Sequence, residues 1–256
     1  MRLSIPLITI ALGLSVTTAI AAASGAPATP AYVTAALNDP ARKDDAADDS
    51  RRQAAAVMTF AQVKPGQKVL ELAPGEGYWT RIFSGIVGAN GRVYTVWPKE
   101  MSKYSAKSFT NWQGLVDHAP YKNVSLLEQP AANLTAPEPV DLVFTSQNYH
   151  DYHDKFMGPV DMAAFDKQVF NELKPGGLFV VVDHTAVAGS GFQATDTLHR
   201  VDPEAVKKEV ESAGFVLDGE SDALKNAADP HTAKVFDPTV RGHTDQFILR
   251  FKKPAH

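Results

Sequence analysis

Two histidine–aspartate pairs stand where their side chains could transfer protons. His150 and Asp151 follow one apolar segment of the chain, and Asp183 and His184 close a second one. An imidazole titrates near neutral pH, so it can remove or supply a proton during a reaction. We therefore take His150, Asp151 and His184 as the candidate catalytic residues, with His150 or His184 as the general base.

The same side chains allow other interpretations. His150, His153 and His184, with Asp151 or Asp183, offer ligand atoms suited to zinc or manganese. Their spacing is loose and matches no metal-binding motif, so we predict no metal site. His150 could also be a turn residue satisfied by backbone, and His184 a structural residue bonded to its neighbour.

A glycine-containing turn joins an apolar segment to an amphipathic stretch. Residues 68–72 are mostly apolar and short enough for a buried strand, and Ala73-Pro-Gly-Glu-Gly77 follows them. The apolar residues after the turn share one helix face: Trp79, Ile82, Phe83, Ile86 and Val87. Glycines let a backbone approach a ligand, and a helix N-terminus presents free N–H groups. The stretch is either a nucleotide-type binding site or a strand–turn–helix without a ligand.

Segments with strand and helix character alternate along the chain. Strands are predicted at residues 68–72, 92–97, 123–128, 139–146, 178–182, 215–219 and 246–251. This alternation requires a doubly wound, mostly parallel α/β sheet of seven strands. No helix separates the last two strands, which predicts that this pair forms an antiparallel edge of the sheet and that the last strand is antiparallel. The polar connection between them, residues 223–245, is long enough to suggest a functional lid.

The order of these segments resembles the class I S-adenosylmethionine (SAM) dependent methyltransferases. The similar segments are residues 69–77 and 140–146, Leu173-Lys-Pro-Gly-Gly177 and Ser212-Ala-Gly-Phe215. More narrowly, the chain resembles the predicted exported bacterial methyltransferases, through Asn148-Tyr-His-Asp151, Val182-Asp-His184, Thr197-Leu-His-Arg200 and the tail at 237–245. The resemblance implies a Rossmann-like methyltransferase fold over most of the mature chain and SAM as the cofactor.

The resemblance also implies which residues bind the cofactor. Glu71-x-Ala73-x-Gly75-x-Gly77 is similar to the family's acid-x-Gly-x-Gly-x-Gly motif, with alanine in place of the first glycine. Asn148 joins this set from the segment after residue 146. Tyr78, and likewise Tyr149, could face the sulfonium through a cation–π contact.

Trp97 departs from the family pattern. It stands where class I enzymes usually carry an acidic residue for the ribose hydroxyls, and it either stacks on adenine or is a core aromatic. Where a second acidic residue usually contacts the adenine amine, only Gln129 and Asn133 are polar candidates. Without those carboxylates, polar groups of the cofactor need other partners.

The N-terminal residues have the pattern of a secretory signal peptide. Arg2 precedes an apolar run to Ile20, and small-x-small cleavage sequences follow. We predict a signal peptide at residues 1–23, a linker and N-terminal extension at 24–49, and a methyltransferase-like domain at 50–256. The protein would then be periplasmic or secreted, with no membrane contact after cleavage. The alternative is an uncleaved anchor, because the apolar run approaches the length needed to span a bilayer.

Composition limits the partners. The net charge of −4 and the lack of a basic run argue against nucleic acid, as does the absence of an Asn-Pro-Pro-aromatic signature at Asn148-Tyr149. The chain has no cysteine, which excludes disulfides and thiolate metal sites. His199-Arg200 is either an anion-binding pair or a surface helix cap. The oligomeric state cannot be predicted.

The leading hypothesis is methyl transfer from SAM to a small molecule outside the cytoplasm. The alternative is a non-catalytic or repurposed methyltransferase-like domain that binds a small ligand in the cell envelope. Trp97 favours the alternative, and so does the cytoplasmic synthesis of SAM.

Overall fold

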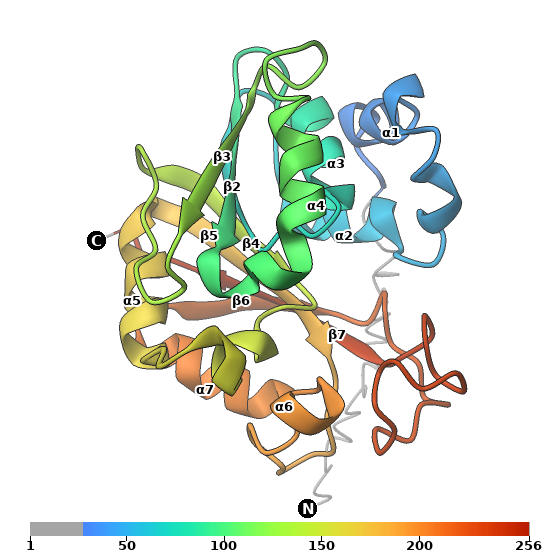
Figure 1. The fold of residues 1–256 in the computed structure, drawn as a ribbon, viewed down its shortest axis with the longest axis vertical. Coiled ribbons are helices and arrows are strands. Elements are labelled where there is room, and N and C mark those ends of the chain that lie inside the picture. Colours follow the sequence, from blue (N-terminus) through green and yellow to red (C-terminus); the bar gives the residue numbers. More distant parts are fainter. Residues whose placement is uncertain (1–27, 256) are drawn as a thin grey trace, which may run out of the picture.

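A seven-stranded sheet runs through the middle of the molecule (Figure 1). The computed structural model describes residues 28–255, so the predicted signal peptide at 1–23 lies outside the described residues. The strands are β1 (Lys68–Leu72), β2 (Arg92–Pro98), β3 (Val124–Gln129), β4 (Val140–Ser146), β5 (Leu173–His184), β6 (Val216–Ser221) and β7 (Gln246–Lys252). Their order is β3-β2-β1-β4-β5-β7-β6.

The pairing confirms the predicted fold class. Strands β1 to β5 pair in parallel, and β7 is antiparallel to both of its neighbours, β5 and β6. Strand β7 lies between β5 and β6, so the last two strands form the antiparallel edge of the sheet, as expected. Strand β5 is longer than predicted, because residues 173–177 continue the strand towards Val140 of β4 instead of forming a turn.

Helices cover both faces of the sheet. One face carries α1 (Ala31–Leu37), α2 (Ala54–Ala61), α3 (Tyr78–Val87) and α4 (Ser102–Gln113). The other carries α5 (Met162–Glu172) and α7 (Pro203–Ser212). The short pieces are α6 (Thr195–Leu198) and the 3-10 turns η1 (Pro40–Arg42), η2 (Ala46–Asp48), η3 (Lys99–Met101), η4 (His150–His153) and η5 (Lys155–Met157). Among the described residues, no helix is long and apolar enough to cross a bilayer.

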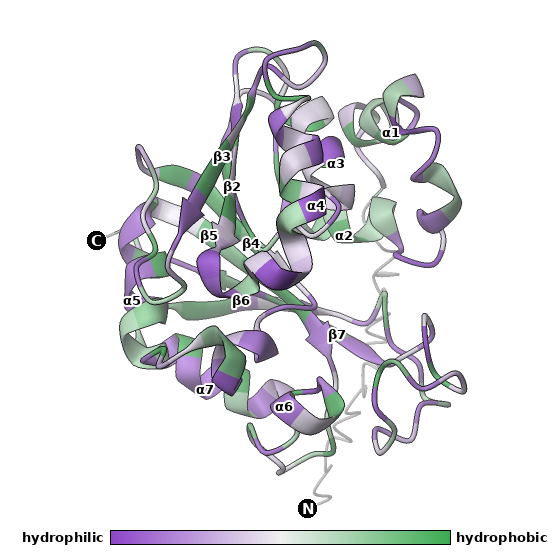
Figure 2. Ribbon diagram, in the orientation of Figure 1, coloured by the Kyte–Doolittle hydropathy of each residue, from purple (hydrophilic) through white to green (hydrophobic). Residues whose placement is uncertain are grey.

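Successive side chains of the central strands point to opposite faces and build two cores. Leu142 and Phe144 of β4 pack beneath α3, whereas Val143 between them packs on the α5 and α7 side. Figure 2 shows the apolar character of these central strands. Burial on both sides explains why β1, β4 and β5 are near-continuous apolar runs in the sequence.

The described part of the N-terminal extension folds against the domain. Helix α1 lies so close to α3 that a Cβ on Gly85 would come within 3.0 Å of the Ala36 Cβ. Arg42 is almost fully buried and forms an ion pair of 2.7 Å with Asp49. Asp45, Asp48 and Arg52 of this segment border the same cavity as the carboxyl end of β1.

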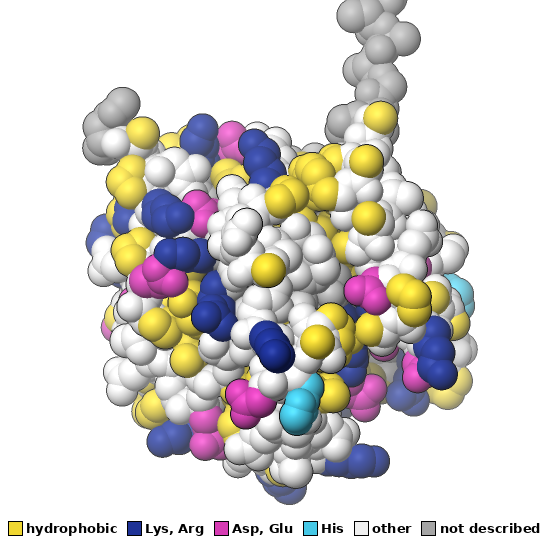
Figure 3. All heavy atoms as spheres, turned by 90° about the horizontal axis from the view of Figure 1, so that it is seen from above, with side chains coloured by type: hydrophobic (Ala, Val, Ile, Leu, Met, Phe, Trp, Pro, Cys, Tyr) yellow, Lys and Arg dark blue, Asp and Glu magenta, His cyan; other side chains and the backbone are white. Residues whose placement is uncertain are grey.

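The face in Figure 3, seen from above, carries lysines and arginines interspersed with acidic and apolar side chains.

Candidate functional site

The turn between β1 and α3 has an unusual backbone conformation. Ala73, Gly75 and Gly77 all have positive φ angles, of 47°, 60° and 83°. Glycine adopts this left-handed region without strain, whereas an alanine there is strained by contact of its Cβ with the backbone. Ala73 therefore occupies a glycine-type position of the motif.

The two glycines of the turn serve different purposes. A Cβ on Gly75 would meet nothing within 4 Å, so this backbone borders open space. A Cβ on Gly77 would lie 2.3 Å from the ring of Trp112, which packs against the turn and donates from Nε1 to Glu76 O at 3.3 Å. Gly75 therefore leaves room for a ligand, and Gly77 makes room for the protein's own tryptophan.

A cavity of about 310 Å³ opens beside Gly75. Its wall is formed by the end of β1 and the turn, by the residues after β4, and by the extension: Asp45, Asp48, Arg52, residues 71–76, Tyr78, Trp79 and residues 146–148. It lies where neighbouring strands β1 and β4 end and their connections diverge to opposite sides. Ligands of open α/β sheets bind at such a point.

Most of the predicted cofactor residues meet at this cavity. Asn148 donates from Nδ2 to Ala73 O at 3.0 Å and to Ser146 O at 2.6 Å, which ties the turn to β4. Glu71 is buried and accepts from the Thr80 hydroxyl at 2.5 Å. Burial raises the pKa of Glu71 to about 8, although the bond from Thr80 opposes this shift.

Tyr78 lines the cavity, but the cations that lie over its ring belong to the protein itself. The guanidinium groups of Arg52 and Arg42 lie 4.5 and 5.4 Å from its ring centroid, where the cation–π contact was expected. Its hydroxyl donates to Asp49 at 2.6 Å. Tyr149, by contrast, does not reach the cavity, because it is buried in the α5 and α7 core.

Trp97 is a core residue. It is 3% exposed, lies edge-on to Phe109 at 5.3 Å, and donates from Nε1 to Thr95 Oγ1 at 2.9 Å. It is not part of the cavity wall. Of the two interpretations left open by the sequence, the structure supports the core aromatic and gives Trp97 no position for stacking on a ligand in this cavity.

The two predicted catalytic histidines meet around a buried carboxylate. His150 Nδ1 lies 2.8 Å from Asp183 Oδ1, and the backbone N–H groups of His150 and His184 both donate to Asp183. The ring centroids of the two histidines are 6.3 Å apart. The expected proximity of β4 and β5 is therefore present, but neither imidazole lines the cavity beside Gly75.

The charge states argue against the expected general base. Burial acts to lower the pKa of His150, but Asp183 and Asp151 outweigh it and raise that pKa to about 10. Burial lowers the pKa of His184 to about 4, and its Nδ1 lies 2.7 Å from Thr244 Oγ1. Near neutral pH His150 already holds its proton and His184 is too weakly basic to take one.

His199 and Arg200 point in different directions, which the sequence did not indicate. Arg200 is fully buried and pairs with both carboxylate oxygens of Asp229, at 2.9 and 3.0 Å, so it cannot serve an anionic substrate. His199 turns the other way, and its Nδ1 lies 3.3 Å from His150 Nε2. Asp151 Oδ1 lies 3.3 Å from His150 Nε2 and 3.8 Å from His199 Nδ1.

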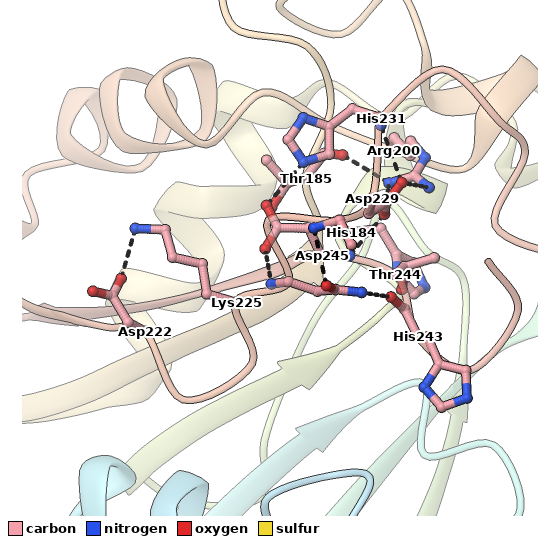
Figure 4. Close-up of polar contacts among 12 residues, drawn as sticks. His184, Thr185, Arg200, Asp222, Lys225, Asp229, His231, His243, Thr244 and Asp245 are labelled. Carbon is pink, nitrogen blue, oxygen red and sulfur yellow. Dashed lines mark hydrogen bonds and ion pairs between the residues drawn. The ribbon is translucent and has the colours of Figure 1, made fainter.

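The long connection between β6 and β7 is held in place by this buried arginine (Figure 4). Besides Asp229, Arg200 bonds the carbonyl oxygens of Ala233 and Thr185. Asp245 accepts from His231 Nε2 at 2.9 Å, and its backbone N–H donates to Asp229. The segment expected to act as a lid is thus fastened to the end of β5. Asp229 gave no signal in the sequence, since polar loop residues are common, whereas Asp245 closes the tail at 237–245 that carries part of the resemblance.

A protein-family model matches the first part of the described chain. The model of the protein-L-isoaspartate(D-aspartate) O-methyltransferase (PCMT) family matches residues 30–113. A protein-L-isoaspartate O-methyltransferase of Methanosarcina mazei is 26% identical over 130 residues, which are 50% of this chain and 45% of that protein. The alignment thus spans less than half the length of the curated relative.

Solved structures match over most of the chain. A SAM-dependent methyltransferase from Aquifex aeolicus has a TM-score of 0.52 at 19% identity, covering 84% of this chain and 94% of that one. The glycopeptide N-methyltransferase MtfA, complexed with SAM, has a TM-score of 0.53 at 15% identity over 83% and 90%. The [4+2]-cyclase SpnF has 0.58 at 15% identity over 80% and 82%. The chain has the class I SAM-dependent methyltransferase fold.

Within this methyltransferase fold, the family match and the histidine cluster occupy different halves. Residues 30–113 run from α1 to the end of α4 and include β1, the glycine turn and most of the cavity wall. His150, Asp183 and His199 all lie beyond residue 113. The sequence likeness therefore concerns the cavity beside Gly75, and the residues around His150 are a feature that the family match does not cover.

Proposed function

We propose that this chain is a SAM-dependent methyltransferase and that the cavity beside Gly75 holds SAM. The observation that carries the proposal is the position of this cavity, at the carboxyl ends of β1 and β4, with the open face of Gly75 in its wall. The matched family model covers the same region, and MtfA shares the fold in complex with SAM. In the reaction, an acceptor lone pair would attack the methyl carbon while the carbon–sulfur bond breaks and S-adenosylhomocysteine leaves.

The charge of the wall supports a cationic ligand. SAM carries a positive sulfonium, a positive ammonium group and one carboxylate. Glu71 keeps its proton at neutral pH, but the wall still contains more acidic than basic side chains: Asp45, Asp48 and Glu76 against Arg52. Within residues 28–255, the buried Nε of Arg52 has no hydrogen-bond partner, and its ion pair with Asp48 is long, at 3.8 Å. An unpaired buried donor is costly, so the ligand carboxylate would relieve it.

We propose a small molecule as the methyl acceptor. The second candidate is an isoaspartyl residue of a protein, because the matched family and the M. mazei relative both carry that name. The match ends before β4, however, and so leaves out the residues at 146–148 that border the cavity on its other side. For this reason the family name supports the cofactor more directly than the acceptor.

The alternative is a domain that binds a ligand of this type without transferring a methyl group. It draws support from SpnF, a protein of the same fold that is named as a cyclase. It also draws support from the N-terminal pattern, from which we propose export to the periplasm or the medium. N-terminal sequencing of the protein from an envelope fraction tests export, and a soluble cytoplasmic pool that retains Met1 would contradict it.

Calorimetric titration of the untagged protein with SAM and S-adenosylhomocysteine tests the cofactor. Wild type should bind both, and Gly75→Val should weaken binding at least about tenfold, or 1.4 kcal/mol, because the side chain fills space next to the ligand. Gly66→Val is the matched control, since Gly66 also has a positive φ and open surroundings but lies at the amino end of β1. Equal loss in both variants would mean that backbone strain is the cause. A wild type that binds neither compound would refute the proposal.

A second pair of variants tests the orientation of the ligand. Arg52→Gln should lower the affinity for SAM. It should not change the affinity for 5′-methylthioadenosine, because this compound lacks the amino-acid carboxylate. The neighbouring exposed Arg51→Gln is the control. A methyl-transfer assay with an isoaspartyl peptide and with a small-molecule extract then separates the acceptors, and SAM binding without transfer to either would favour the non-catalytic alternative.

A further inference from the structure

Three potential metal ligands converge beyond the end of β4. His150 and Asp151 belong to η4, and His199 follows α6, which packs beside that turn. Their ligand atoms are His150 Nε2, Asp151 Oδ1 and His199 Nδ1. We propose that these three residues form a binding site for a divalent transition-metal ion of the zinc type, independent of the cavity beside Gly75.

The distances between the three atoms suit a metal ion. They are 3.3 Å between the two nitrogens, 3.3 Å from His150 Nε2 to the carboxylate, and 3.8 Å from His199 Nδ1 to the carboxylate. Ligands about 2.0–2.1 Å from a tetrahedral zinc ion are separated from one another by about 3.4 Å. A point about 2.0 Å from all three atoms lies between them, so little movement would be needed to bind an ion.

Asp183 holds the first histidine in the orientation that a metal requires. It lies 2.8 Å from His150 Nδ1 and is itself fully buried. A carboxylate bonded to one ring nitrogen fixes the tautomer and directs the lone pair of the other nitrogen towards the ion, as in carboxylate–histidine–zinc arrangements. Here that other nitrogen is Nε2, the atom that faces Asp151 and His199.

The charges around the cluster favour a cation. Asp151 and Asp183 are both buried beside His150. Asp154, whose backbone N–H bonds Asp151 O, is also buried. Buried carboxylates normally require an opposite charge or a metal. A divalent ion would supply this charge in place of a proton on His150.

The site is partly exposed on one side, and its three residues leave one coordination position of a four-coordinate ion open. The His199 side chain is 21% exposed, while the His150 side chain is 3% exposed, so an ion would enter from the His199 side. Two imidazoles and one carboxylate leave an open position, which structural zinc sites fill with a fourth protein ligand and catalytic sites reserve for water or substrate. His150 is two residues from Asn148, which lines the cavity. A metal-bound water or acceptor oxygen would therefore sit at the same edge of the sheet.

Titration of the chelator-treated, untagged protein with Zn²⁺ tests the site without reference to methyl transfer. Wild type should bind one equivalent, and His199→Ala and Asp151→Asn should each lower the affinity at least about 100-fold. Asp183→Asn should lower it about 10- to 100-fold, as expected for a residue that orients a ligand. Co²⁺ gives a second readout, because its visible absorption should show bands of a four- or five-coordinate ion that are lost in His199→Ala.

His231→Ala is the matched control, because His231 is likewise bonded to one carboxylate, Asp245, but does not belong to the cluster of three potential ligands. It should leave Zn²⁺ binding unchanged, and circular dichroism should confirm that every variant is folded. The proposal is overturned if wild type binds no Zn²⁺ tighter than about 10 µM, or if folded His199→Ala and Asp151→Asn bind as wild type does. Failure of this test would leave the proposal for SAM intact, since the two ligands occupy different residues.

Discussion

Replacing Glu71 by glutamine should change how the stability of the protein depends on pH. Glu71 is buried, and its pKa rises from an ordinary value of 4.5 to about 8. Between these two values the folded state keeps the proton that the unfolded state has lost. Folding stability contributed by this group is complete below pH 4.5 and is lost as the pH rises towards 8.

The size of the effect follows from the shift. Each pH unit inside this window costs about 1.4 kcal/mol of the free energy of unfolding. Glutamine cannot ionise, so Glu71→Gln should gain on wild type by up to about 4 kcal/mol between pH 5 and pH 8. The test is the change of this stability difference with pH. A constant difference that comes from the altered hydrogen bond to Thr80 is the same at every pH and does not affect that change.

Urea unfolding of both proteins at pH 5, 6, 7 and 8 measures the difference. The exposed Glu211→Gln is the control, and its difference from wild type should stay constant over the series. If the Glu71→Gln difference is also constant, Glu71 is not protonated in the folded state and the argument from burial is wrong. If the stability gain of Glu71→Gln over wild type falls as the pH rises, folding does not raise the pKa of Glu71.

Two further changes test the turn and the buried arginine. Ala73→Gly should raise the free energy of unfolding by about 1 kcal/mol and Tm by about 2–4 °C, because it relieves the strain of an alanine in the left-handed region. The control, Ala205→Gly in α7, should lower the free energy of unfolding by about 1 kcal/mol. If thermal melts show Tm changes of the same sign for both variants, Ala73 is not strained. Arg200→Ala should lower the free energy of unfolding by about 3–5 kcal/mol, because it leaves Asp229 buried without its partner. Replacing the exposed Arg241 by alanine should lower it by less than about 0.5 kcal/mol. Equal urea midpoints for the two variants would show that the ion pair does not hold the connection between β6 and β7.

The sequence determined the elements and the position of the cavity. Its signals are local: the apolar run of β1, the positions of the small residues from Ala73 to Gly77, and the helical spacing from Trp79 onwards depend only on neighbours in the chain. Strand, turn and helix in this order predict where a ligand binds, because parallel strands bring their carboxyl ends to one edge. The seven strands and the antiparallel β7 were predicted for the same reason.

The tertiary structure alone decided what the polar residues do. The sequence allows Trp97 to stack on a ligand, but the fold packs its ring against Phe109 in the core. His199 and Arg200 are neighbours in the chain, yet the left-handed backbone at His199, with φ of 52°, sends one towards His150 and the other towards Asp229.

The pKa values of the two histidines also depend on the tertiary structure. His150 and His184 look alike in the sequence, and their pKa values of about 10 and about 4 arise from the carboxylates and the burial that the fold imposes. Local pattern fixes secondary structure because helices and strands are periodic. Long-range contacts fix chemistry, because charge, solvent exposure and ligand geometry depend on residues that are distant in the chain.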